Sequence, residues 1–417
     1  MLIRNKTCFV YDIEAFPNFF SVTIKNTESG NIKTYEISDR KNDMPNIAKL
    51  FLRKGIQFVG FNSMHYDSPL ISYILINYKR LILRPVWEIT YELKQFSDKI
   101  INSETSASWS QYKYANLFPD LDLLAMKWSQ KLRTSLKALQ VTMEYRNVEE
   151  YSGDFNEPLP KDKIDELINY NINDVESTEE LLNRCKNDID LRIAIEDKYH
   201  ISALNKDGVN LGMEIIKKYY LDDTGKSWNE IKDLRSCVDE IPLKDVIFDY
   251  IEFHNPTLQN VLKKLKSTTI PITNVPKGYK FEIKFEIGGV RHTYGIGGLH
   301  SENNPEKFEP DNNEMLIDSD VTSLYPSIIL QNHLFPAHLG EDFLNVYQTI
   351  YNQRVTAKKE GRNVENETLK LALNGLTGNL QSLFSWVYDP MMVFKINFSL
   401  TIQWCIGKLS LLIAGNS

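Results

Sequence analysis

The sequence predicts a protein of several domains that combine the α/β and α+β fold classes. Its 417 residues are enough for two or three domains of about 150 residues each. Hydrophobic residues make up 42% and charged residues 25% of the chain, which are ordinary values for globular proteins and exclude disordered, collagenous and coiled-coil chains. Runs with a strand pattern alternate with runs with a helical pattern near the N-terminus, and this mixture indicates a sheet covered by helices.

The expected elements of the first domain follow from these patterns in order. Its opening residues alternate between apolar and polar side chains, with turn-forming residues between the runs, as is typical of strands. Helical patterns then flank a further strand, and a long amphipathic run closes the domain near residue 200. The expected strands are Thr7–Ile13, Phe19–Ile24, Thr34–Ile37 and Ile56–Phe61, and the expected helices are Asn46–Lys54, Pro69–Tyr78 and Lys161–Lys186.

The rest of the chain is expected to form a connector and a further unit. Residues 201–310 contain prolines, paired glycines and a group of lysines, which indicate short strands and turns; the lysines could line a DNA groove or simply solvate a hairpin. A strand is expected at Glu314–Val321, with helices at Phe343–Lys359 and Glu367–Leu380. We therefore expect three domains, at 1–200, 201–310 and 311–417.

The charge and the cysteines narrow the class of function and the compartment. A net charge of −7 argues against a protein that coats nucleic acid non-specifically, but not against an enzyme that gathers carboxylates around metal ions. Cys8, Cys185, Cys237 and Cys405 lack the spacing of a zinc site or a disulfide framework, which fits a reducing compartment. The apolar stretch Met391–Ala414 is interrupted by polar residues and is expected to be a buried helix. We expect a cytoplasmic protein, in the host cytoplasm if it is viral, with no membrane partner.

Acidic residues occur in three separate patterns of the first domain. Asp12 and Glu14 are two residues apart in a strand, so both side chains share one face and can share a divalent cation. Asp67 follows the fourth strand and precedes a helix, where loops carry functional groups. Tyr170 and Asp174 are four residues apart and share one helical face. The alternatives are a solvated strand face, a helix N-cap at Asp67 and a plain amphipathic helix.

Taken together, the patterns D-x-E, N-x-x-x-Y-D and Y-x-x-x-D resemble the proofreading 3′–5′ exonuclease domain of family B DNA polymerases. The resemblance implies a ribonuclease H-like fold and two Mg²⁺ ions, with Mn²⁺ as a possible substitute, that hydrolyse DNA. It also implies that Tyr170 orients the attacking water and that Lys137 contacts the scissile phosphate, unless Lys137 is an ordinary surface lysine. The catalytic and metal-binding carboxylates would be Asp12, Glu14, Asp67 and Asp174.

A second resemblance lies in the run DSDVTSLYPSII, which is similar to polymerase motif A of the same family. It implies that Asp320 is catalytic and that Asp320 and the adjacent Val321 bind Mg²⁺, whereas Asp318 is structural. Ser323, Leu324 and Tyr325 would bind the incoming nucleotide, and the Tyr325 ring would exclude a 2′-hydroxyl. The nucleotide expected here is therefore a deoxynucleoside triphosphate.

Lys370-x-x-x-Asn374-x-x-x-Gly378 resembles motif B, in which one helical face carries a lysine and an asparagine toward the nucleotide. The family usually has Ser and Tyr where this chain has Gly375 and Thr377. Arg354 on the preceding helix resembles a second phosphate-binding cation. Lys358 and Lys359 are rival positions for that role, and the run can also be an exposed basic helix end.

The sequence departs from the family after motif B. The family's Tyr-x-Asp-Thr-Asp hairpin is absent, and Asp389 is the sole acidic residue after Asn374. We therefore expect an exonuclease domain followed by a partial palm with short helical fingers. This chain would degrade single-stranded 3′ ends and would extend a primer–template only with dNTP and a complementing C-terminal fragment. The alternatives are a truncated remnant that acts only as an exonuclease and a non-catalytic DNA-binding subunit.

Overall fold

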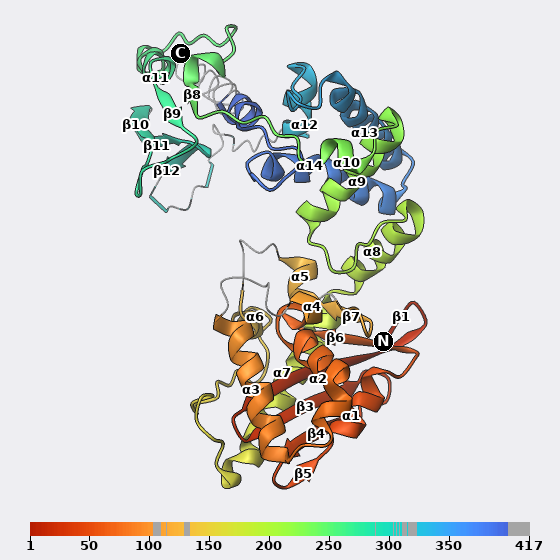
Figure 1. Cartoon of the computed structure of the whole chain (residues 1–417). Coiled ribbons are helices and arrows are strands. Elements are labelled where there is room, and N and C mark those ends of the chain that lie inside the picture. The colour runs from red at the N-terminus through yellow and green to blue at the C-terminus, as the bar shows by residue number, and fades with distance from the viewer. Residues whose placement is uncertain are drawn as a thin grey trace. The chain divides into compact units, whose positions relative to one another are not determined.

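The chain divides into two compact units, Met1–Gly208 and Val209–Ser417 (Figure 1). The computed structural model describes residues 1–102, 110–113, 115–128, 134–287, 289–302, 304–305, 307, 309–310, 315 and 323–398. Helices and a mixed sheet occur together, which confirms the α/β class. The strand expected at Glu314–Val321, and with it Asp318, Asp320 and Val321, lies outside the described residues, as does Cys405. The division expected at residue 310 stays a prediction.

A mixed sheet forms the centre of the first unit. Its strand order is β5-β4-β3-β2-β6-β7, and β1 also pairs with β2. The strands β2, β3, β4 and β5 run antiparallel to their neighbours, whereas β6 is parallel to β2 and β7 is parallel to β6. The strand bounds are β1 Leu2–Ile3, β2 Lys6–Phe16, β3 Phe19–Asn26, β4 Ile32–Ser38, β5 Lys41–Asn42, β6 Ile56–Gly60 and β7 Asp120–Asp122.

Helices cover both faces of this sheet. One buried cluster joins apolar side chains of β2, β3, β4 and β6 to α1, α2 and α3. A second cluster joins β2, β6 and β7 to α5, α6, α7 and α8. The run expected as one helix to Lys186 is divided at Cys185 into α7 and α8. The helix bounds are α1 Met44–Phe51, η1 Ser63–His65, α2 Asp67–Leu81, α3 Val86–Asn102, α4 Ser110–Lys113, α5 Leu123–Lys127, α6 Leu136–Thr142, η4 Lys161–Lys163, α7 Ile164–Arg184 and α8 Lys186–Tyr199.

The second unit combines helices with two small sheets. The strands β10, β11 and β12 form an antiparallel sheet, and β8 pairs with β9. The glycine-rich segment YGIGGLHS forms the turn between β11 and β12, where Gly298 has a φ of 122° that favours glycine. The bounds are α9 Gly208–Thr224, α10 Trp228–Ile231, β8 Glu240–Pro242, η5 Leu243–Asp245, α11 Pro256–Lys266, β9 Thr269–Pro271, β10 Glu282–Ile287, β11 Val290–Gly295, β12 Gly298–Glu302, α12 Leu324–Gln331, α13 Glu341–Lys359 and α14 Asn363–Asn379.

Three helices of the second unit, α12, α13 and α14, pack against one another. Residues 390–398 are also helical, and they are the described part of the buried helix expected at 391–414. Asp389 precedes this helix, and its carboxylate accepts hydrogen bonds from the backbone amides of Ala337 and Met392. Asp389 is therefore a structural residue. Among the described residues, the structure contains no helix that is both long and apolar enough to cross a membrane.

Candidate active site

Asp12 and Glu14 lie on the face of the sheet that α7 covers. Tyr11 and Ile13 of the same strand belong to the core on the opposite face, so the alternation of a strand turns the two acidic side chains toward α7. Asn171 of α7 donates from Nδ2 to Asp12 Oδ2 at 2.5 Å and to Glu14 Oε1 at 3.4 Å. The two carboxylates thus share one face, as the spacing predicts.

The helix α7 has apolar ends and a polar, buried middle. Its buried apolar residues pack against the sheet near either end, whereas Asn171, Asp174 and Ser177 are buried between them. This polar stretch lies where β2 presents carboxylates instead of apolar side chains, so the two elements match in polarity. The helix therefore positions Asp174 beside the β2 acids, and the helical period places the half-buried Tyr170 one turn away.

Two residues of α6 contact the same carboxylate. The Lys137 ammonium lies 2.5 Å from Asp174 Oδ1 and 4.5 Å from the centroid of the Tyr170 ring. Gln140 Nε2 donates to the same Asp174 oxygen at 3.1 Å. Lys137 is therefore part of this cluster and is not an isolated surface lysine.

Asp67 is buried at the start of α2, and it is not the N-cap of that helix. The N-cap is Tyr66, which makes no side-chain capping hydrogen bond. Asp67 Oδ1 is buried and has no hydrogen-bond partner, although a buried polar atom without a partner is costly. The side chain is thus available to a ligand, and the capping alternative is wrong.

A single carboxylate, that of Asp122, holds the loop that leads to Asp67. It accepts hydrogen bonds from the backbone amides of Asn62 at 2.9 Å and Met64 at 3.1 Å. Its Oδ1 also caps α5 by accepting from the amides of Leu124 and Ala125. This loop is therefore fixed to the end of β7.

The start of the same loop is tightly packed. A Cβ atom at Gly60 would lie 2.5 Å from Cβ of Ser63, so this position has no room for a side chain. Ser63 Oγ in turn donates to Asp120 Oδ2 at 2.9 Å. These contacts leave the chain one compact path from β6 into α2.

Burial and mutual repulsion raise the pKa values of the acidic groups. Burial raises the pKa of Asp12 to about 7, and the charge of Asp174 adds to the rise. Burial, followed by the charges of Asp12 and Asp174, holds the pKa of Glu14 well above its ordinary value. Burial and then Asp12 do the same to the pKa of Asp67. Because each pKa is affected by another carboxylate, Asp12, Glu14, Asp67 and Asp174 form one electrostatic cluster.

The chemistry of this cluster fits a divalent cation. Its donors are carboxylate oxygens, which Mg²⁺ and Mn²⁺ prefer, and buried carboxylates need a compensating positive charge. Within the described parts of the chain, no three His, Cys, Asp or Glu side chains already have the arrangement of a metal site. The Lys137 ammonium supplies a positive charge to Asp174 in this arrangement. A cation bound here would be held by Asp12, Glu14, Asp67 and Asp174.

Three buried residues around the cluster are absent from the sequence-based prediction: Asn171, Gln140 and Asp122. Asn171 could have been found, because it lies three residues before Asp174 and therefore on the same helical face. Gln140 and Asp122 carry no such local signal. Their partners are 34 and about 60 residues away along the chain, so only the folded structure relates them to the site.

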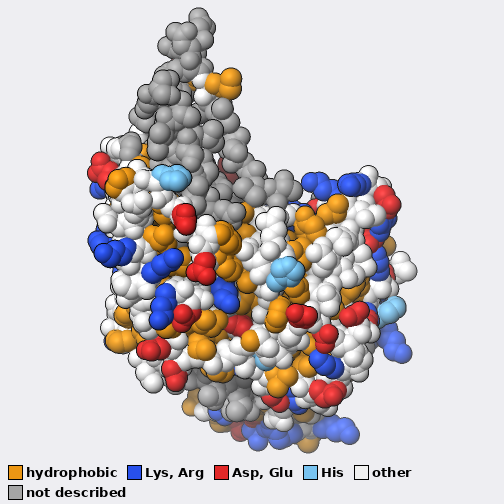
Figure 2. All heavy atoms as spheres, turned by 90° about the horizontal axis from the view of Figure 1, so that it is seen from above, with side chains coloured by type: hydrophobic (Ala, Val, Ile, Leu, Met, Phe, Trp, Pro, Cys, Tyr) orange, Lys and Arg blue, Asp and Glu red, His pale blue; other side chains and the backbone are white. Residues whose placement is uncertain are grey.

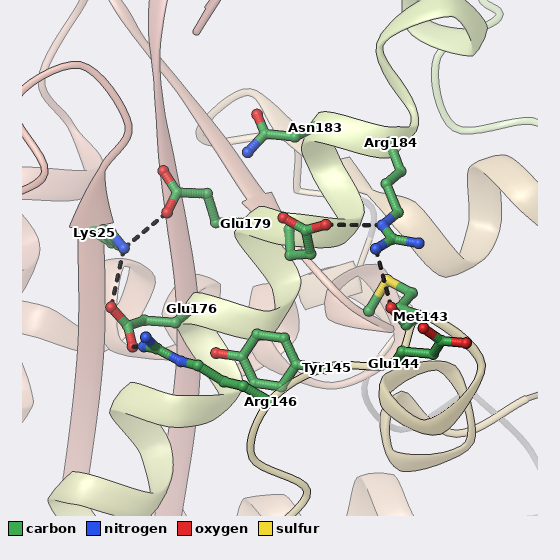
Figure 3. A pocket seen from close by; sticks show the side chains of 10 residues that line it. Lys25, Met143, Glu144, Tyr145, Arg146, Glu176, Glu179, Asn183 and Arg184 are labelled. Carbon is green, nitrogen blue, oxygen red and sulfur yellow. Dashed lines mark hydrogen bonds and ion pairs between the residues drawn. The ribbon is translucent and has the colours of Figure 1, made fainter.

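Two cavities lie in the first unit. A cavity of about 600 Å³ is lined by Tyr170 and Tyr151 and by acidic residues of α7 and of the segment before it. A second, of about 330 Å³, lies on another part of α7 (Figure 3). There Lys25 is paired with Glu176 and Glu179, and the arginines also bind glutamates. The charges of the second cavity therefore compensate one another.

The nucleotide-binding residues expected in the second unit are distributed over the packed helices α12, α13 and α14. Arg354 Nη1 donates to Ser323 Oγ at 3.0 Å, which joins α13 to the start of α12. The Arg354 Nε atom is buried without a hydrogen-bond partner, whereas the rivals Lys358 and Lys359 are exposed. Leu324 is half-buried, and Tyr325, Lys370 and Asn374 have exposed side chains.

The lysines expected near a DNA groove lie partly on α11 and partly around β10. Lys280 and Lys284 are both paired with Glu282, at 2.6 Å and 3.6 Å, so their charge is partly neutralised. Acidic and basic side chains are interspersed over the described part of the face shown in Figure 2. A DNA groove formed by these lysines stays a prediction.

Comparisons with known proteins leave the functional argument to these side chains. The sequence matches no model of a known protein family, and a search of curated proteins finds no match. The resemblance to family B polymerases thus depends on the motif residues, and the contacts among them carry the argument that follows.

Proposed function

We propose that the first unit is a metal-dependent 3′–5′ exonuclease on single-stranded DNA, with a ribonuclease H-like fold, in a protein of the family B DNA polymerase type. The observation that carries the proposal is the contact of Asn171 with Asp12 and Glu14, beside Asp174. Residues 159 positions apart in the chain thus join the strand motif to the helix motif. The sheet supports the fold, because antiparallel β4, β3 and β2 are followed by parallel β6 and β7.

The side chains have separate roles in this proposal. The carboxylates of Asp12, Glu14, Asp67 and Asp174 would bind the cations, which stabilise the attacking and leaving oxygens when bound. Burial and then the charge of Asp174 raise the pKa of the Tyr170 phenol, so Tyr170 stays protonated and can donate a hydrogen bond to orient water. The Lys137 ammonium would bind the phosphate once it leaves Asp174.

The exonuclease proposal makes a direct prediction for the unmodified protein. A single-stranded DNA labelled at its 5′ end should shorten stepwise from its 3′ end with Mg²⁺, and EDTA should stop the reaction, because the carboxylates need the cation. A strand whose 3′-terminal linkages are phosphorothioates is the control and should resist degradation. Binding of DNA without any degradation would instead favour the DNA-binding subunit.

We also propose that the second unit binds a deoxynucleoside triphosphate, and that primer extension requires a partner polypeptide carrying the motif that this sequence lacks. The supporting observation is the hydrogen bond between Arg354 and Ser323, which joins a cation to the motif A segment. The free Nε of Arg354 gives it a further donor for phosphate. An exonuclease remnant is the alternative, and it would bind no nucleotide here.

Replacing the arginine tests this second proposal. Arg354→Ala should weaken dNTP binding by roughly tenfold or more, because a charge-assisted hydrogen bond contributes about 1.5–3 kcal/mol. Arg362→Ala is the control, since Arg362 pairs with Glu360 and Glu365 instead. Calorimetric titration of dNTP with Mg²⁺ measures both variants. Equal weakening by the two substitutions would contradict a specific role for Arg354.

A further inference from the structure

Two buried side-chain amides contact the carboxylates of the candidate active site. Asn171 Nδ2 on α7 donates to both Asp12 and Glu14, and Gln140 Nε2 on α6 donates to Asp174. Asn171 and Gln140 are both 0% exposed. All three acidic residues therefore receive a hydrogen bond from a neutral group that water does not reach.

The other half of each amide is left without a partner. Asn171 Oδ1 and Gln140 Oε1 are buried and accept no hydrogen bond. Such a buried acceptor costs about 1–3 kcal/mol, whereas an apolar side chain of similar size would avoid this cost. The packing therefore does not explain why amides occupy these positions. Local choices that oppose stability are expected at functional sites.

The NH₂ groups do have a physical consequence. Asp12 and Glu14 are buried on one strand face, and each raises the pKa of its surroundings by repulsion. An amide nitrogen has two hydrogens, so one Asn171 side chain can hold both carboxylates and offset part of that repulsion. Lys137 adds a full charge at Asp174 but can move away, since its side chain is long and half-buried.

We infer that Asn171 and Gln140 are positioning residues of a divalent-cation site: their amides hold the carboxylates of Asp12, Glu14 and Asp174 toward one another so that a cation can bind them together. The inference rests on the proposed function and adds two residues to the machinery of the same site. Residues that orient metal ligands typically contribute 10- to 100-fold to metal affinity.

The test uses the full chain and Mn²⁺ binding, measured by calorimetric titration and by the rise in Tm with added metal. Asn171→Leu and Gln140→Met keep the volume of each side chain but remove the donor. The matched controls are Asn173→Leu, on the same helix, and Gln57→Met, on β6. Both control amides are buried and donate to backbone carbonyls, those of Asn147 and Phe58.

We expect Asn171→Leu and Gln140→Met to weaken Mn²⁺ binding by about 10- to 100-fold, and the controls by less than twofold. Saturating Mg²⁺ should restore most of the DNA degradation rate, because the substitutions affect metal affinity and not the reacting groups. Unchanged Mn²⁺ affinity in both folded variants would overturn the inference while leaving the exonuclease intact. Weakened Mn²⁺ binding in a protein that degrades no DNA would support the inference and overturn the proposed function.

Discussion

Asp12→Ala is expected to reduce the rate of 3′-end degradation by at least about 10³-fold. The cations contribute several kcal/mol of transition-state stabilisation, and each 1.36 kcal/mol corresponds to a tenfold change in rate. Asp12 is in contact with Asn171 and within the electrostatic reach of Asp174, so its loss removes a ligand and disturbs the others. The measurement is single-turnover degradation of a 5′-labelled strand at saturating Mg²⁺.

The control for this experiment is Asp43→Asn. Asp43 is also a buried carboxylate of the first unit, but it accepts hydrogen bonds from the Glu36 amide and from Asn46 at the start of α1. Its substitution should leave the degradation rate unchanged at a temperature where the variant is folded. A fully active Asp12→Ala protein would show that the nuclease activity arises elsewhere or from a contaminant.

Asp67→Asn is expected to stabilise the metal-free protein at pH 8 by a few kcal/mol. The folded protein holds the pKa of Asp67 well above its ordinary value through burial and the charge of Asp12, so removing the charge removes repulsion. Raised pKa values in the fold mean that the folded state binds more protons than the unfolded chain. The free energy of unfolding in EDTA should therefore fall as the pH rises from about 4 to about 7.

Thermal unfolding in EDTA between pH 4 and pH 8 measures this effect. The Tm advantage of Asp67→Asn should disappear near pH 4, where the wild-type carboxyl groups are protonated, and Mg²⁺ should raise the Tm of the wild type only. Asp43→Asn provides the opposite sign. Burial raises the pKa of Asp43, but hydrogen bonds from Lys41 and the Glu36 amide outweigh it and lower the pKa, so this substitution should destabilise. A wild-type Tm that does not fall across this pH range would contradict the account.

The sequence pattern predicts the elements of the first unit because each is encoded locally. The alternation around Asp12 and Glu14 gives β2 and its two faces, and the spacing of Tyr170 and Asp174 gives their common face on α7. Contacts between distant segments are a different matter. Nothing near Gln140 in the sequence indicates that its amide reaches Asp174, because that contact depends on how α6 packs on α7.

The role of Asp67 illustrates the same limit from the other side. An acidic residue just before a proline-started helix has the pattern of an N-cap, and local chemistry alone cannot choose between capping and ligand binding. The choice depends on Asp122, whose carboxylate fixes the loop through the amides of Asn62 and Met64. With the loop held in this way, the helix begins at Asp67 and Tyr66 is its N-cap.

The Asp122 carboxylate also couples the motions of two segments. Four backbone amides, two in the loop before α2 and two in the first turn of α5, have this one side chain as their acceptor. Breaking the attachment of either segment leaves a buried charge less well solvated, which favours opening of both at once. The two segments therefore behave as one cooperative unit in amide hydrogen exchange, and local fraying of α5 reaches the approach to Asp67.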